Sequence, residues 1–397
     1  MANETSARLA ALRITHFKSI GEARLDRLGP VTVLVGPNAA GKSNLVDALR
    51  FLRDVADEGL EHALSDRGGI TLVRQAGLAP PPQVGLEVDL SDEAGQPLAH
   101  YALEVRSHSH ARFRIAHEAA EWAAAQTRPG QSDAQGAEGS RHRFERDRKD
   151  VVHVHDGDAA AESVELAPHA AALGVLGANP LGKWLREVAF CTVYPDSMRD
   201  PRRPDSDERL KESGENWATV LRALRKTEVG RVRLEQVRQA VSFMLPGLEE
   251  VTVKSVGGYL VPQFMVRNWS DRRLYPLDPV RLSTGTLRLF GMLLAVHQLP
   301  APALAVIEEP EQSLNPQLFG VLVQALRQVS RHTQIIITTH SPQLVDMFEP
   351  EEIRVVSFEE GSTRVASVHA SQIDAVKRKL GSLGEYMAGD GLQPDLG

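Results

Sequence analysis

The chain contains 397 residues with a formal net charge of −7, and 42% of its residues are hydrophobic and 24% charged. This length exceeds one typical domain, and the apolar content is sufficient for a large core with an inserted lobe. The acidic balance excludes a protein coated with basic side chains for nucleic acid, but it permits a local basic face.

The composition also excludes several locations and architectures. The sequence has no run of about 20 apolar residues that would predict a membrane span, and its start lacks the apolar run of a signal peptide. Its one cysteine, Cys191, cannot form an internal disulfide, and it lies in the apolar stretch 188–193, which predicts a buried structural thiol. We therefore expect a cytoplasmic protein with no membrane partner.

The first strong motif is the stretch 36–43, which matches the phosphate loop G-x-x-x-x-G-K-[ST]. It follows an apolar strand, 31–35, and precedes a helix with apolar residues at helical spacing. The glycines let the backbone wrap closely around a phosphate, while Lys42 reaches the β- and γ-phosphates and Ser43 holds Mg²⁺. The predicted nucleotide-binding residues are Gly36, Pro37, Asn38, Ala39, Ala40, Gly41, Lys42, Ser43 and Asn44.

The middle of the chain predicts strands, a loop and helices. Alternating residues in 84–116 predict strands, and the low-complexity stretch near 118–150 predicts a loop at the tip of an antiparallel sheet. A short helix at 181–186 leads into the Cys191 strand, helices are expected over 210–241, and strands at 251–254 and 259–266.

The helices expected over 210–241 form the most basic region of the sequence. They are the best candidate surface for nucleic acid or for an acidic partner, although exposed helix faces usually carry such charge for solubility. The basic residues are Arg222, Arg225, Lys226, Arg231, Arg233 and Arg238.

Three further motifs follow in the last part of the chain. Leu282-Ser283-Thr284-Gly285 opens a helix, so the hydroxyl of Ser283 and the amide of Gly285 can bind a phosphate. An apolar strand, 303–307, ends in Glu308 and Glu309, and another, 334–339, ends in His340. Because parallel strands place their carboxyl ends at one ligand-binding edge, these three side chains are expected to meet there.

Each of these residues has a predicted catalytic role. Glu308 would hold Mg²⁺, Glu309 would orient or deprotonate the attacking water, and His340 would sense the γ-phosphate. Taken singly, the two acids also fit a solvated turn, and His340 fits a helix N-terminal residue without a ligand. Their order together with the phosphate loop favours the catalytic interpretation.

The order of motifs resembles the ABC-class ATPase head, and within it the RecF, SMC and OLD-like branch of AAA family ATPases. The strings Leu12–Ser19, Glu308–Glu311 and Thr338–Pro342 carry this resemblance beyond the phosphate loop. It implies an α/β P-loop NTPase with a mixed sheet core, an antiparallel β lobe and an inserted helical and β lobe. It also implies ATP and Mg²⁺ as cofactors and an ATP-dependent homodimer, in which each signature closes on the γ-phosphate of the other subunit.

The sequence departs from the pattern of this branch at several positions. Glu308 stands where many relatives have Asp, Thr284 and Thr286 replace Gly and Gln of the commonest signature, and Asn315 also replaces Asp. The Q-loop glutamine is either Gln75 or Gln83. These departures leave the hydrolysis rate and the preference for ATP over GTP open.

The spacing of the motifs suggests three segments. Residues 1–90 form an N-terminal ATPase lobe with the phosphate loop, 91–280 an inserted β and helical region, and 281–397 a C-terminal ATPase lobe. Without sustained heptads we expect no coiled-coil arm, and few residues follow His340, so we expect no TOPRIM nuclease domain.

Two functions fit these observations. The first is an ATPase that dimerises around nucleotide and acts in DNA repair and maintenance or in defence against mobile DNA, with DNA or a separately encoded nuclease as partner. The alternative is an ATP-dependent switch that regulates a separate effector or toxin protein without direct DNA contact.

Overall fold

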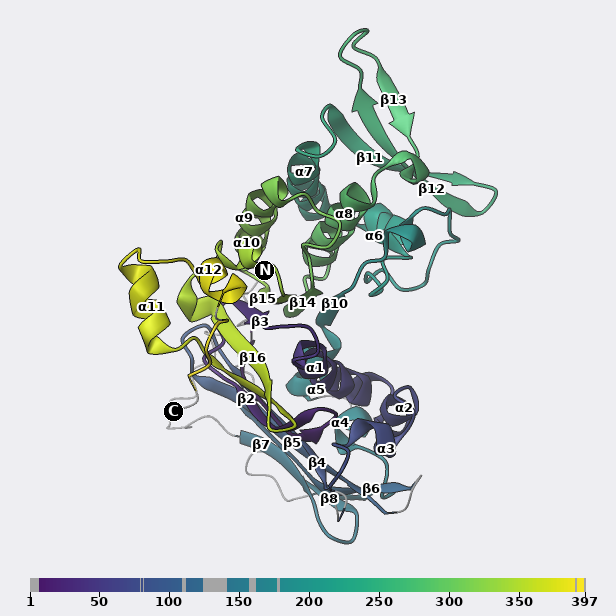
Figure 1. Cartoon of the computed structure of the whole chain (residues 1–397). Helices are drawn as coiled ribbons and strands as arrows, with labels where there is room; N and C mark the ends of the chain where they lie inside the picture. The colour runs from purple at the N-terminus through teal and green to yellow at the C-terminus, as the bar shows by residue number, and fades with distance from the viewer. Residues whose placement is uncertain are drawn as a thin grey trace, which may run out of the picture. The chain divides into compact units, whose positions relative to one another are not determined.

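The computed structural model describes residues 7–78, 80, 82–108, 112–123, 141–156, 162–176, 179–389 and 391–395. The chain forms two compact units, each assembled from segments that are distant in sequence (Figure 1). The first unit comprises Met1–Leu28, Asn38–Arg186 and Val356–Ala366, and the second comprises Gly29–Pro37, Glu187–Val355 and Ser367–Gly397. The three sequence segments stay a prediction about domains.

The first unit is built on an eight-stranded antiparallel sheet with the order β2-β1-β4-β5-β6-β7-β8-β9. Apolar and polar residues alternate along its strands, as in β4, so one face is buried and the other is polar. The strands are β1 (Arg8–Phe17), β2 (Ile20–Leu25), β4 (Val84–Ser91), β5 (Pro97–Ser107), β6 (Phe113–Ala123), β7 (Arg141–Arg146), β8 (Val151–Asp156) and β9 (Glu162–Glu165).

Five helices belong to the first unit, and the first and the last of them contact strands of this sheet (Figure 1). They are α1 (Lys42–Asp57), α2 (Leu60–Ser65), α3 (Ile70–Val73), α4 (Ala172–Val175) and α5 (Pro180–Arg186). Helix α1 buries the predicted apolar stripe, which includes Leu45, Leu49 and Leu52, and it contacts β1, α4 and α5. The helix that follows the phosphate loop is therefore fixed to the unit along its length.

A six-stranded sheet with the order β10-β14-β15-β3-β16-β17 carries the remaining motifs. Strands β10, β14, β15, β3 and β16 pair in parallel, and β3 is buried at every residue. The strands are β3 (Val31–Val35), β10 (Val188–Cys191), β14 (Leu304–Glu308), β15 (Gln334–Thr339), β16 (Ile353–Glu359) and β17 (Ser362–Ser367). The compact units divide this sheet within β16, since Val356–Ala366 belongs to the first unit.

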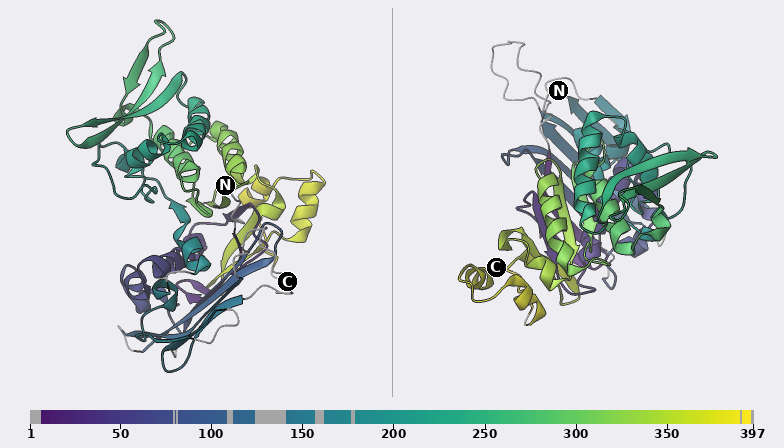
Figure 2. Two further views of the ribbon diagram at one scale, coloured as in Figure 1. Left: turned by 180° about the vertical axis from the view of Figure 1, so that it is seen from behind. Right: turned by 90° about the horizontal axis from the view of Figure 1, so that it is seen from above.

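The second unit packs helices and a small antiparallel sheet around α8 (Thr284–His297), which is buried at nearly every position. The other helices are α6 (Trp217–Leu224), α7 (Glu228–Ser242), α9 (Phe319–Val329), α10 (Pro342–Val345), α11 (Ala370–Lys377) and α12 (Leu383–Ala388), with 3₁₀ turns at Pro195–Met198, Pro279–Arg281, Pro316–Leu318 and Pro350–Glu352. Strands β11 (Leu248–Val256), β12 (Tyr259–Arg267) and β13 (Leu274–Leu277) form the small sheet, in which β11 contacts α6 and α7 and β12 contacts α6 (Figure 2). The rings of Trp217, Phe264 and Phe290 stack edge to face or tilted in this core.

The predicted mixed α/β architecture with an antiparallel β lobe is confirmed. Cys191 is buried as predicted, and burial raises the pKa of its thiol to about 12. None of the helices in the described part of the chain combines the length and apolar character that a membrane span needs.

Two expectations about the middle of the chain are wrong in detail. The loop predicted near 118–150 is shorter, because residues 118–123 belong to β6 and 141–146 form β7; residues 124–140 lie outside the described part. The helices begin at Trp217 rather than at residue 210, because the Asn216 side chain bonds the carbonyls of Asp207 and Arg209 and holds the preceding segment in an irregular turn.

Candidate functional site

The phosphate loop forms a tight turn between the end of β3 and the start of α1. Gly41 caps the helix with φ 103°, and Ala39 also has a positive φ, 64°. The first helical turn closes when the N–H groups of Asn44 and Leu45 donate to the Gly41 carbonyl. The loop thus enters a helix N-terminus, the arrangement that binds phosphate groups.

The helix behind the loop is tied to the end of β1 by charge. Asp47 accepts from Lys18 at 2.7 Å and from Arg67 at 2.9 Å. Burial raises the pKa of the Asp47 carboxyl, but these hydrogen bonds outweigh burial and hold its pKa below the usual value. The Phe-Lys-Ser string at the end of β1 therefore fixes α1, a role that the sequence did not show.

The motif residues of the second unit gather at one edge of the parallel sheet. In the strand register Glu308 pairs with Thr338, and Thr339 pairs with Val35, so β14, β15 and β3 end together. Glu308 is the last residue of β14, and Glu309 follows it with φ 45°. A positive φ at a residue other than glycine is strained, and such strain clusters at functional sites.

His340 lies beside two carboxylates at this edge. Its Nδ1 atom is 3.4 Å from Glu309 Oε1 and 3.7 Å from Glu311 Oε1. Glu311 also accepts from Thr339 Oγ1 at 2.6 Å and from the His340 N–H at 3.2 Å. We call Glu308, Glu309, Glu311 and His340 the carboxylate edge.

Glu311 is the member of the carboxylate edge that sequence reasoning missed as a site residue. Its side chain is 8% exposed, and its Oε2 atom is buried without a hydrogen-bond partner among the described residues. Its position in the Glu-Glu-Pro-Glu string, two residues after Glu309, was the available signal. A buried carboxylate oxygen without a partner indicates a place where a ligand or water completes the bonding.

The signature residues lie at the start of α8. The exposed Ser283 caps the helix by accepting from the Thr286 N–H at 3.0 Å, and a Cβ atom at Gly285 would overlap the Ser313 carbonyl. Gly285 thus allows α8 to pack against the loop after Glu309. The binding of phosphate by Ser283 and Gly285 stays a prediction.

Arg288 joins the signature helix to the carboxylate edge within the second unit. Its guanidinium donates to the carbonyls of Glu308 and Glu309 at 3.4 and 3.2 Å. Burial lowers the pKa of Arg288 below its usual value, and its Nε atom is buried without a partner in the described part of the chain. Arg288 therefore links the backbone of the carboxylate edge directly to α8.

The two candidates for the Q-loop glutamine have different surroundings in the first unit. Gln75 pairs with His16, with Nδ1 and Oε1 3.0 Å apart, and it borders Gly21. Gln83 faces Glu104 and Arg106 of β5. The choice between them stays a prediction.

The expected basic surface on α6 and α7 is largely neutralised. Arg225 pairs with Glu250, Arg231 with Glu228, Arg238 with Glu235 and Lys226 with Glu208. Arg233 is half-buried and donates to the Gln298 carbonyl, and burial lowers its pKa. Most of these basic residues are therefore already paired, and the role of this region as a surface for nucleic acid or an acidic partner stays a prediction.

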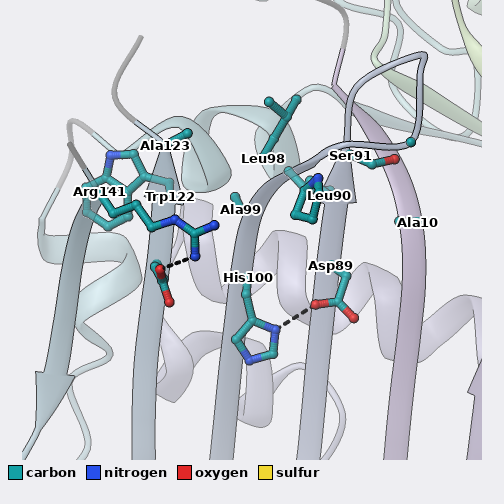
Figure 3. A pocket seen from close by; sticks show the side chains of 13 residues that line it. Ala10, Asp89, Leu90, Ser91, Leu98, Ala99, His100, Trp122, Ala123 and Arg141 are labelled. Atoms are coloured by element: carbon teal, nitrogen blue, oxygen red, sulfur yellow. Dashed lines mark hydrogen bonds and ion pairs between the residues drawn. The ribbon is translucent and has the colours of Figure 1, made fainter. Parts of the chain in front are cut away.

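A pocket of about 200 Å³ lies on the polar face of the eight-stranded sheet, away from the motif residues (Figure 3). His100 pairs with Asp89 at 2.7 Å, and Arg141 pairs with Glu121 at 2.6 Å. The hydrogen bond that His100 donates to the Asp89 carboxylate is the main cause that raises the pKa of His100. These four charged side chains are thus paired with each other, and none of them belongs to the predicted nucleotide-binding motifs.

The fold and the motif geometry together define a class of protein. The parallel sheet leads into a phosphate loop, and two of its strands end in paired carboxylates and a histidine. A signature helix lies in the same unit as these carboxylates. This combination defines the head of an ABC-class ATPase. The family described as "AAA domain, putative AbiEii toxin, Type IV TA system" matches residues 31–96 and 172–346, which is more than half of the sequence. The chain belongs to this family.

Other comparisons agree with this class. The chain is 33% identical over 87 residues to the DNA replication and repair protein RecF of Thermosynechococcus vestitus, an overlap of 18% of this chain and 23% of that protein. The chain thus spans about a quarter of the length of this curated relative.

Two solved SMC heads share the fold. An SMC head bound to the C-winged helix domain of ScpA has a TM-score of 0.55 at 13% identity, covering 93% of this chain and 99% of that one. An SMC head domain with an extended coiled coil, bound to the C-terminal domain of ScpA from Pyrococcus furiosus, has a TM-score of 0.53 at 11% identity, covering 94% and 99%. The predicted ABC-class head of the RecF and SMC-like branch is confirmed.

Proposed function

We propose that this chain binds ATP with Mg²⁺ and hydrolyses it. The observation that carries the proposal is the register of the parallel sheet, in which β3, β14 and β15 end together at Val35, Glu308 and Thr339. In this proposal Lys42 holds the β- and γ-phosphates, and Ser43 and Glu308 hold Mg²⁺. Glu309 positions the attacking water and His340 contacts the γ-phosphate. Phosphoryl transfer depends on such positioning and charge stabilisation.

We further propose that ATP joins two copies of the chain. Ser283 is exposed at the N-terminus of α8, where its hydroxyl and the helix amides are suited to meet a phosphate held by a second subunit. Arg288 then connects that contact to the backbone of Glu308 and Glu309. Dimer closure and hydrolysis are coupled through this helix.

For the partner of the dimer we propose DNA, in repair and maintenance or in defence against mobile DNA. The support is the similarity to a relative described as a DNA replication and repair protein. Because the protein carries a net charge of −7, binding must come from local basic groups and depend strongly on salt.

The second candidate is an ATP-dependent switch that regulates a separately encoded effector or toxin protein. The neutralised charge of α6 and α7 favours it, because helices whose arginines already pair with Glu228, Glu235 and Glu250 attract phosphate backbones weakly. The two candidates share the ATP-driven dimer and differ only in what the dimer binds.

The dimer is tested by light scattering in the Glu309→Gln background, with and without Mg-ATP. We expect a monomer without nucleotide, a dimer with ATP, and a monomer with ATP once Ser283→Arg is added. Ser65→Arg, at an exposed serine of α2, is the matched control and leaves the dimer intact. A protein that stays monomeric with ATP at high concentration contradicts the composite site.

The partner is tested by retardation of duplex and single-stranded DNA with the ATP-bound Glu309→Gln protein. We expect weak, sequence-independent binding that disappears as salt rises. An ATP-bound dimer that retards neither DNA at low salt favours the effector switch.

A further inference from the structure

The start of β17 reaches the phosphate loop from the far end of the sequence. Thr363, the second residue of this strand, is 0% exposed. Its Oγ1 atom donates to the Ala40 carbonyl at 3.0 Å, and its N–H donates to the Ser19 carbonyl at 2.8 Å. Thr363, Ser19 and Ala40 all belong to the first unit, so these contacts lie within one compact body.

The hydroxyl of Thr363 is one link in an ordered series of hydrogen bonds. Its only proton goes to Ala40, so the 2.7 Å bond to Ser19 must be donated by the Ser19 hydroxyl. The Ser19 oxygen in turn accepts from Asn44 Nδ2 at 2.6 Å. The series Asn44–Ser19–Thr363–Ala40 therefore begins and ends in the predicted nucleotide-binding segment.

Gly41 packs directly on the same threonine. A Cβ atom at Gly41 would overlap the Thr363 side chain, and φ is 103°. The glycine is thus required by the contact with Thr363 as well as by the backbone conformation of the loop.

Fixing the Ala40 carbonyl also fixes the next amide. In a planar trans peptide the C=O of one residue and the N–H of the next point in opposite directions. Since the Ala40 carbonyl is held toward Thr363, the Gly41 N–H is held away from it. Preorganised amides are the groups with which such a loop binds phosphate.

The neighbouring residue extends these contacts. Ser362 Oγ accepts from the Gly21 N–H at 2.8 Å, and Gly21 also borders the amide of Gln75. The start of β17 therefore contacts the phosphate loop and Ser19, and it bonds Gly21, which in turn borders a candidate Q-loop glutamine.

We propose that Thr363 is a positioning residue for nucleotide binding, which sets the Ala40–Gly41 peptide of the phosphate loop through its hydroxyl. The inference rests on the proposed ATP binding. It assigns to the start of β17 a role in affinity for ATP, whereas a purely structural threonine would affect folding stability alone.

The test compares two buried threonines that lose the same kind of bond. Thr363→Val removes the donor to Ala40, and Thr333→Val removes a 2.9 Å bond from another buried threonine to the Pro302 carbonyl. The Kd for Mg-ATP is measured by calorimetry in the Glu309→Gln background, and Tm is measured without nucleotide. Thr363→Ser, which keeps the hydroxyl, serves as the rescue.

We expect Thr363→Val to raise the Kd about tenfold, which corresponds to about 1.4 kcal/mol, the size of one buried hydrogen bond. Thr363→Ser should stay close to the parent protein. Thr333→Val should lower Tm to a similar extent and leave the Kd unchanged. If Thr363→Val does not fold, Ser19→Ala interrupts the same series from its partly exposed side and should raise the Kd by a smaller factor.

Equal Kd values for the parent, Thr363→Val and Ser19→Ala proteins overturn the positioning role. This outcome differs from failure of the proposed function. In that case the parent protein does not bind Mg-ATP, or Lys42→Ala binds it as well as the parent does.

Discussion

The phosphate loop and the carboxylate edge differ in how their polar atoms are bonded. At the loop, neutral hydroxyl and amide groups pass hydrogen bonds from Asn44 through Ser19 and Thr363 to Ala40. At the carboxylate edge, Glu309 has a positive φ, and Glu311 Oε2 is buried without a partner in the described part of the chain. At the loop, groups of the protein supply the hydrogen-bond partners. At the carboxylate edge, a buried carboxylate oxygen still needs a partner, which a bound ligand or water would supply.

The largest effect is expected at the loop, from Lys42→Ala. Affinity for Mg-ATP should fall at least about 100-fold, because a charge-assisted hydrogen bond contributes roughly 3 kcal/mol and the loop loses its cation. Calorimetry measures the Kd, and Lys377→Ala, which removes a surface ion pair with Glu351, is the control with unchanged affinity. Unchanged affinity in Lys42→Ala would show that the loop does not bind phosphate.

The second effect separates the carboxylate edge from the loop. Glu309→Gln should keep the Kd for Mg-ATP and lower turnover by roughly 10²- to 10⁴-fold, the range attributed to general acid–base catalysis. Phosphate release measures turnover, and Glu249→Gln, at a surface ion pair with Arg267, is the control. Full turnover in Glu309→Gln would show that Glu309 does not position the attacking water, and Glu308 or Glu311 would then be the candidate for this role.

A third test examines a neutral group far from the carboxylate edge, at the C-terminal end of α8. His297 is buried, and burial, with a smaller effect of Arg233, lowers its pKa from the usual 6.5 to about 4. Between these values the unfolded chain binds a proton that the folded chain does not, so stability is lost as pH falls below 6.5. Moving from pH 7 to pH 5 should remove about 2 kcal/mol of the unfolding free energy through this group.

Urea unfolding at the two pH values measures this loss. His297→Gln should reduce the difference between pH 7 and pH 5, while the control His332→Gln, at an exposed position, should keep it. An equal pH dependence in both variants would contradict the role of His297.

The smallest effect is expected at the basic residues of α6 and α7 and the turn between them, most of which are paired with carboxylates. Replacing Arg222, Arg225 and Arg231 with Glu should change DNA retention by the ATP-bound dimer by less than about threefold, in line with the small contribution of surface ion pairs. The basal ATPase rate is the control and should not change. Complete loss of DNA binding in this variant would show that these helices form the DNA-binding surface.

The parts that the sequence predicted well depend on local patterns. The apolar strand 31–35, the stripe of α1 and the buried position of Cys191 follow from periodicity and composition over a few residues. The position of Glu308 and His340 at one edge follows from a general property of parallel sheets, so the sequence alone was sufficient to predict it.

The parts that were missed depend on which distant segments come together. Nothing near Gly41 in the sequence indicates Thr363, because the contact depends on the placement of strand β17. The pairing of Arg225 with Glu250 likewise depends on the packing of α6 against β11, so the sequence alone showed a basic helix and not its neutralisation.

The order of strands in the six-stranded sheet has a consequence for synthesis of the chain. Strand β3 leaves the ribosome early, yet its neighbours β15 and β16 are translated roughly three hundred residues later. Until then Val31–Val35, which is buried throughout the finished fold, lacks both strands that pair with its backbone N–H and C=O groups. The contact from Thr363 to the phosphate loop likewise forms only after translation has passed that residue.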